Sequence, residues 1–138
     1  MGYIKHDTVV VTSWDEKRLQ KAREKAVELY TKAFSKNSLY TEEDKKTLKS
    51  EFGEKNFVIS PIIQGVANGQ CSFLIAPDGS KEGWEPSDLS NQAREEFLEW
   101  LKLDEDELYC EYIHIRFGGD DSSEKILSSN YIDRGEEN

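Results

Sequence analysis

The stretch Asn68-Gly69-Gln70-Cys71-Ser72-Phe73-Leu74-Ile75-Ala76 decides the fold of this chain. Asparagine and glycine both tolerate the positive φ angles of a type I′ turn, and an Asn-Gly pair between two apolar runs is a strong hairpin signal. The preceding apolar run, residues 57–63, is interrupted by Ser60-Pro61, and proline confines a strand to a sheet edge or a bulge. We therefore expect residues 70–76 to return antiparallel to an edge strand at 57–63.

The residues before this hairpin predict a strand and two helices. Residues 3–12 are rich in β-branched side chains and end in a run of valines, which is typical of a buried strand. Residues 13–16, Ser-Trp-Asp-Glu, match a capping box. Apolar residues then recur at steps of three and four up to about Lys36, as in an amphipathic helix. A short polar helix is expected at residues 41–52, as an insertion.

The residues after the hairpin predict a second long helix and a last strand. An apolar stripe from Leu89 to Leu101 indicates the helix, with Ser87 or Asp88 as its N-terminal cap. Residues 108–117 alternate strictly, as expected of a strand that is covered on one face only. One face of this strand carries Ile113, Ile115 and Phe117, and the other carries Tyr112, His114 and Arg116.

This order of elements predicts an α+β fold, the ferredoxin-like βαββαβ sandwich. Two helices would cover one face of a four-stranded antiparallel sheet and leave the other face open. The two central strands would lie side by side with a parallel sense, and the last strand would flank the first. We expect a single domain at residues 1–121 and a polar tail at 122–138, which covers part of the open face or packs on a neighbouring subunit of a homo-oligomer.

The charge of the chain is strongly uneven. Its 138 residues, enough for one domain, carry a formal net charge of −10. Residues 1–69 have twelve Lys and Arg against ten Asp and Glu, whereas residues 70–138 have six against eighteen. An acidic surface keeps a small protein soluble, and in some inhibitors it imitates a nucleic acid. General nucleic-acid binding is not expected, although a local cationic pocket remains compatible with a small phosphorylated ligand.

Other classes of function find little support in the sequence. No apolar run is long enough to span a membrane and the N-terminus lacks a signal-peptide pattern, so a cytoplasmic location is expected. Cys71 and Cys110 lie in apolar runs and are expected to be reduced, structural thiols. The acidic clusters lack the spacing of calcium loops, and no glycine pattern for phosphate binding is present, so we expect neither a metal site nor a cofactor.

The best candidate site is the loop at residues 77–86. It places Ser80, Lys81 and Trp84 on a turn-forming segment between a strand and a helix, where a scaffold can present side chains for recognition. Trp84 would stack on a base while Lys81 and Ser80 contact phosphate. Alternatively, Trp84 closes the end of the core. Arg116 is a second cation candidate, on the open face, unless it forms a salt bridge with an acidic neighbour.

Two histidines mark a weaker, catalytic candidate. His6-Asp7-Thr8 resembles the His-x-Thr motif of 2H phosphoesterases, in which two such motifs activate water and protonate a leaving oxygen. The resemblance implies catalytic roles for His6, Thr8 and His114, on neighbouring strands. The second motif, His114-Ile115-Arg116, has arginine where the family has a hydroxyl. The alternative is that both histidines are ordinary residues of the sheet surface.

Residues 8–14, Asn68-Gly69 and residues 72–84 resemble a group of small proteins of phage and mobile-element genomes that has no settled activity. The resemblance spans most of the chain except the inserted helix and the tail. It implies a setting in which small proteins antagonise host defence, either by blocking a protein or by sequestering a nucleotide signal.

Three functions follow as hypotheses. The first is a non-catalytic, phage-type accessory protein that binds a small anionic ligand, such as a cyclic nucleotide signal. The second is an acidic protein–protein inhibitor of a host defence factor, and the third is a 2H-like phosphoesterase. We expect a binding protein rather than an enzyme.

Overall fold

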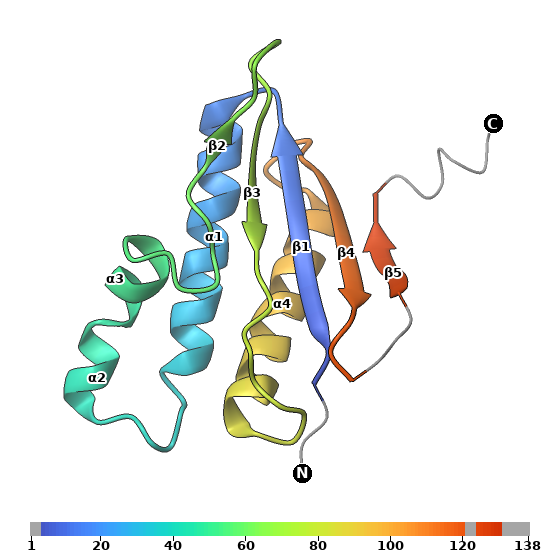
Figure 1. Ribbon diagram of the computed structural model, residues 1–138. Helices are drawn as coiled ribbons and strands as arrows, with labels where there is room; N and C mark the ends of the chain where they lie inside the picture. The colour runs from blue at the N-terminus through green and yellow to red at the C-terminus, as the bar shows by residue number, and fades with distance from the viewer. Residues whose placement is uncertain (1–3, 121–123, 131–138) are drawn as a thin grey trace.

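The computed structural model describes residues 4–120 and 124–130, and it has an α+β fold with an antiparallel, open, five-stranded sheet. The elements are β1 (His6–Ser13), α1 (Glu16–Phe34), α2 (Glu42–Lys46), α3 (Leu48–Gly53), β2 (Ile63–Gln64), β3 (Cys71–Ile75), α4 (Glu85–Leu103), β4 (Glu111–Phe117) and β5 (Glu124–Ser129). The strand order is β2-β3-β1-β4-β5. The two long helices, α1 and α4, lie side by side on one face of the sheet (Figure 1).

The hairpin that the sequence predicts is confirmed. Asn68 and Gly69 have φ angles of 60° and 69°, and the Gln70 amide donates to the carbonyl of Ala67, which closes the turn. The first strand of the hairpin is shorter than predicted, because only Ile63 and Gln64 pair with β3. Upstream, Ile59 forms an isolated bridge with Ile75, and the proline at position 61 has no amide hydrogen with which to continue the pairing.

The central strands are antiparallel, so the predicted parallel sense is wrong. Val11 of β1 lies opposite Phe73 of β3 and opposite Tyr112 of β4, and both pairings are antiparallel. The chain direction explains this. The helix α1 returns the chain so that β2 runs in the same direction as β1, and the hairpin then reverses it into β3.

The sheet has five strands rather than the predicted four, because part of the predicted tail pairs with β4. Strand β5 lies antiparallel to β4, with a bulge between His114 and Ile115. Most side chains of β5 are exposed, and Ile126 is 60% exposed. The short polar insertion is present as two separate helices, α2 and α3.

The helix α4 begins earlier than predicted, and this shortens the candidate loop. Trp84 is its N-cap residue, and Pro86 occupies the first turn, where its fixed φ suits a helix and its missing N–H is not needed. The predicted caps, Ser87 and Asp88, are therefore already helical. As a result, Ser87, Asn91 and Arg94 lie at helical spacing along one side of the first half of α4.

The core lies between the sheet and the two long helices. Val9 and Val11 of β1 are fully buried, as is Phe97 of α4, whose ring centre lies 6.2 Å from that of Phe73. Cys71 and Cys110 are free and buried, and burial raises the pKa of the Cys110 thiol to about 11. The N-cap of α1 is Asp15, rather than the first residue of the predicted capping box, and its carboxylate accepts hydrogen bonds from the first-turn amides.

The faces of β4 are the reverse of those predicted. Tyr112, His114 and Arg116 pair with Val11, Val9 and Asp7, so they face the helices, and the apolar residues Ile113, Ile115 and Phe117 lie on the open face. Other apolar residues share the open face, namely Val10, Leu74, Ile63 and Ile126. Within the described residues, no helix has the length and apolarity needed to cross a membrane.

Candidate functional site

A buried carboxylate with three basic partners lies at the end of the sheet where β1 begins. Asp7 Oδ1 is 3.0 Å from His114 Nε2 and accepts a hydrogen bond of 3.1 Å from Arg116 Nε. A terminal guanidinium nitrogen of Arg94 lies 3.6 Å from Asp7 Oδ2. The side chain of Asp7 is 11% exposed and that of Arg94 is 8% exposed, so this ion pair is largely withdrawn from water.

The register of the sheet and the phase of α4 bring these groups together. Asp7 and Arg116 are direct cross-strand partners, and opposite charges in this position attract each other. His114 is two residues away on β4 and so shares the face of Arg116. Arg94 comes from the helix above the sheet and also donates to the side-chain oxygen of Asn91, one turn earlier.

The partners of Asp7 keep it ionised. Burial alone would raise the pKa of the Asp7 carboxyl, but the hydrogen bond to His114 and the charges of Arg94 and Arg116 outweigh burial and hold this pKa below its ordinary value of 3.8. Asp7 is therefore a fixed negative charge at neutral pH that orients two guanidinium groups.

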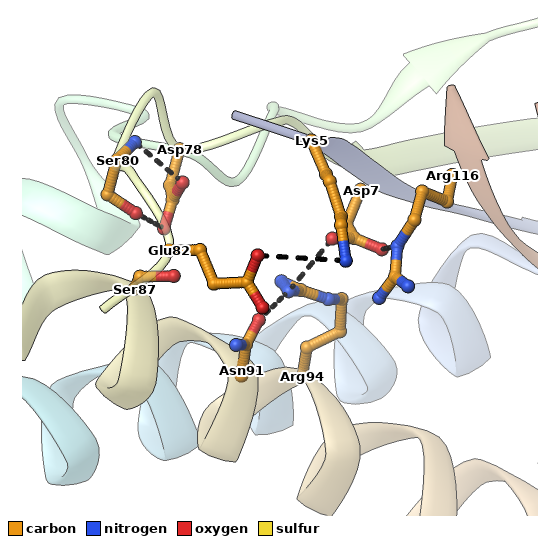
Figure 2. Close-up of a pocket in the computed structure, with 9 residues that line it drawn as sticks. All are labelled: Lys5, Asp7, Asp78, Ser80, Glu82, Ser87, Asn91, Arg94 and Arg116. Carbon is orange, nitrogen blue, oxygen red and sulfur yellow. Dashed lines mark hydrogen bonds and ion pairs between the residues drawn. The ribbon is translucent and has the colours of Figure 1, made fainter. Parts of the chain in front are cut away.

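A small hollow of about 60 Å³ lies beside this cluster. Its lining comes from β1 and the residue before it, β4, the first half of α4 and the loop before α4, and comprises Lys5, Asp7, Asp78, Ser80, Glu82, Ser87, Asn91, Arg94 and Arg116 (Figure 2). Pockets that enclose a drug-sized ligand measure roughly 300–1,000 Å³. This hollow therefore suits one small polar group rather than a whole nucleoside.

The structure brings two of the four predicted ligand-binding residues to the hollow. Ser80 and Arg116 line it, and the Ser80 hydroxyl donates to Asp78. Arg116 forms a salt bridge with an acidic neighbour, Asp7, which was the alternative to a ligand contact. It does so on the face that the helices cover, so its predicted place on the open face is wrong. Lys81 and Trp84 are not among the lining residues. The Lys81 ammonium lies 5.5 Å from the centre of the Trp84 ring, and this ring is half exposed rather than part of the core.

The two histidines do not form a common site. His6 lies opposite Phe117 and His114 lies opposite Val9, which places the histidines on opposite faces of the sheet. On the open face, the Thr8 hydroxyl donates to the backbone carbonyl of Ile75. This geometry excludes the paired arrangement that the likeness to 2H phosphoesterases implies, because both histidines would have to approach one substrate.

The sequence pattern misses Lys5, Asn91 and Arg94 and gives Asp7 no role of its own. The sequence does contain a spacing signal for Asn91 and Arg94, because with Ser87 they recur at steps of four and three along α4. That stripe is polar, and polar stripes on a helix usually face water, so the spacing alone does not distinguish a site from a solvated surface.

Among the described residues, no group of three or more His, Cys, Asp and Glu side chains is placed to hold a metal ion. Comparisons with protein-family models, with curated proteins and with solved structures found no match for this chain. The candidate function therefore depends on the geometry of the hollow and of the surfaces around it.

Proposed function

We propose that this protein is a non-catalytic binding protein for a small anionic ligand, whose anionic group enters the hollow between Arg94 and Arg116. The observation that carries the proposal is that one buried carboxylate, Asp7, orients guanidinium groups from two different elements beside the same hollow. Guanidinium groups recognise phosphates and carboxylates through paired, charge-assisted hydrogen bonds. Because Asp7 orients them in advance, a ligand loses less free energy in ordering them.

Lys5 adds a third positive charge at the mouth of the hollow. Its ammonium lies 3.8 Å from a carboxylate oxygen of Glu82, whose side chain is 62% exposed. An exposed ion pair of this kind contributes at most about 1 kcal/mol. An incoming anion can therefore displace Glu82 from Lys5 at little cost, and we propose that Lys5 then contacts the ligand.

A cyclic nucleotide is one anionic ligand that suits these surroundings. Its phosphate would occupy the hollow and its base would remain outside, where the half-exposed ring of Trp84 offers a flat surface for stacking. Lys81, whose ammonium lies against this ring, would be close to a base stacked there. On this proposal the protein is a phage-type accessory protein that antagonises host defence by sequestering a nucleotide signal.

The fold that presents this site is proposed to be a ferredoxin-like sandwich with one added strand. The order β2-β3-β1-β4 and the position of both long helices on one face support the βαββαβ arrangement. Strand β5 would then be an extension at the β4 edge.

Replacing Arg116 with glutamine tests the ligand-binding proposal. We expect at least a tenfold loss of affinity, because a hydrogen bond to a charged group contributes roughly 1.5–3 kcal/mol. The measurement is isothermal titration calorimetry with a panel of cyclic nucleotides and inorganic phosphate. The matched control is Arg18→Gln, which removes an arginine of α1 whose guanidinium lies over the Tyr109 ring, outside the lining of the hollow. The proposal fails if no panel member binds more tightly than millimolar, or if both variants bind like the parent protein.

A second candidate function, protein–protein inhibition, is favoured by the apolar open face. Ile63 and Ile126 are more than half exposed there and Phe117 is 40% exposed, and exposed apolar patches often mark protein interfaces. On this alternative, the partner is a host defence factor with an apolar surface of its own.

Replacing Ile126 with lysine tests this alternative. A charge placed within a desolvated contact should reduce capture of a stoichiometric host protein at least tenfold, whereas Arg116→Gln should leave the capture unchanged. The measurement is quantitative pull-down from host lysate. If a small ultraviolet-absorbing molecule co-purifies with the protein instead, and no protein does, the inhibitor alternative is rejected in favour of the ligand-binding proposal.

A further inference from the structure

The two sides of the hollow carry opposite charges. Figure 2 shows Asp78 and Ser80 of the loop on one side, and Lys5, Arg94 and Arg116, with their partner Asp7, on the other. Glu82, from the same loop, extends its carboxylate between the two sides. The loop therefore forms an acidic wall, whereas Lys5 before β1, Arg116 of β4 and Arg94 of α4 give the other wall an excess of positive charge over Asp7.

The acidic wall is less fully neutralised than Asp7. Asp78 accepts hydrogen bonds from the Ser80 amide at 3.0 Å and from the Ser80 hydroxyl at 2.8 Å, and both donors are uncharged. Among residues 4–120 and 124–130, no basic side chain lies within ion-pair distance of Asp78. The ion-pair contact of Glu82 with Lys5 is loose, at 3.8 Å.

The loop holds this acidic wall in place. The Asp78 carboxylate and the Ser80 amide form a turn of the type that aspartate makes with the backbone two residues ahead. Gly79 lies inside the turn with a φ of 80°, a conformation that suits glycine. An uncompensated carboxylate is thus presented to the hollow at a defined position, and it would repel a ligand that carried negative charge alone.

We infer that the hollow selects a dipolar ligand over a purely anionic one, with an anionic head on the Arg94 and Arg116 side and a primary ammonium group, on a short linker, on the Asp78 and Glu82 side. This inference rests on the proposed function, because it assumes that an anion binds at the arginines. The small volume of the hollow requires the two charges to be only a few bonds apart. A ligand of this kind satisfies both walls, and its ammonium group replaces Lys5 as the partner of Glu82.

Two nearly isosteric probes test the inference, phosphoethanolamine and n-propyl phosphate, which differ by an ammonium in place of a methyl group. We expect the parent protein to bind phosphoethanolamine at least tenfold more tightly by calorimetry. In the double variant Asp78→Asn, Glu82→Gln, this ratio should fall to about one, because a carboxylate is needed to pair with an ammonium. Asparagine at position 78 can still accept from the Ser80 amide, so the turn is retained.

The control variant is Asp88→Asn, which removes an exposed carboxylate of the first turn of α4 outside the lining of the hollow, and it should keep the ratio of the parent protein. If both probes bind the parent protein equally, or n-propyl phosphate binds more tightly, the inference is wrong and the proposed function stands. If neither probe nor any cyclic nucleotide binds, the proposed function fails and the inference fails with it. A ratio that survives in the double variant also overturns the inference, since the acidic wall would then not be its cause.

Discussion

Replacing Asp7 with asparagine should lower the free energy of unfolding by about 3–5 kcal/mol, the usual cost of removing one partner of a buried ion pair. The reason is the position of Arg94, whose side chain is 8% exposed and has Asp7 as its acidic partner within the described residues. Without the carboxylate, a buried guanidinium would lose its counter-charge. Urea denaturation followed by circular dichroism measures the change.

A double-mutant cycle separates the ion pair from a simple change of shape. Combining Asp7→Asn with Arg94→Met removes both charges, and the double variant should be more stable than the sum of the single effects predicts by about 1–3 kcal/mol. The interpretation is wrong if the two effects add, because Asp7 and Arg94 would then not stabilise each other.

The single variant Asp7→Asn should also change how the stability of the fold depends on acid pH. The partners of Asp7 hold its pKa in the folded state below 3.8, its ordinary value. The contribution of Asp7 to stability is therefore fully present above about pH 4 and is lost as the pH falls through the lowered pKa. In the asparagine variant this loss should be missing. Equal acid slopes for the two proteins would show that Asp7 does not carry the effect.

Replacing Phe97 with alanine should cost about 3–5 kcal/mol, as for other large aromatic side chains in protein cores. Phe97 is fully buried, and its ring packs near Phe73 of β3 and near Trp100 of its own helix. Removing it leaves a cavity between α4 and the sheet. Because Arg94 lies one turn away on the same helix, loss of this anchor should also loosen the hollow.

The matched control for this variant is Leu103→Ala, on the last turn of the same helix. Leu103 is 65% exposed, and substitutions at exposed sites usually change stability by no more than about 0.5 kcal/mol. The two variants are compared by thermal and urea denaturation. Similar losses from both would contradict the described packing of α4.

The sequence predicts the sequential order of the strands and long helices well, because the decisive signals are local. The Asn68-Gly69 turn depends on backbone conformations that few residues adopt, and the apolar stripes of α1 and α4 depend on helical spacing alone. The sequence does not predict strand β5. Its residues are mostly polar, and its pairing with β4 depends on a partner distant in the fold.

The candidate site could be predicted only in part, because its residues meet through tertiary structure. Alternation along β4 correctly separates Ile115 from Arg116, but it does not show which face the helices cover. The face of β4 that carries Arg116 is the one that packs toward the helices, where Asp7 is the buried partner of Arg116. The burial of Arg94 cannot be predicted from the sequence, since a single arginine in an amphipathic helix normally faces water.

The position of β5 has a consequence for the behaviour of the protein at high concentration. Among the residues that the structure describes, it is the last strand of an open sheet, and an edge of this kind presents backbone donors and acceptors with which another extended chain can pair. The bulge between His114 and Ile115 breaks its regularity, and Lys125 places a charge within it. Both features oppose the regular edge-to-edge stacking of copies from which fibres grow.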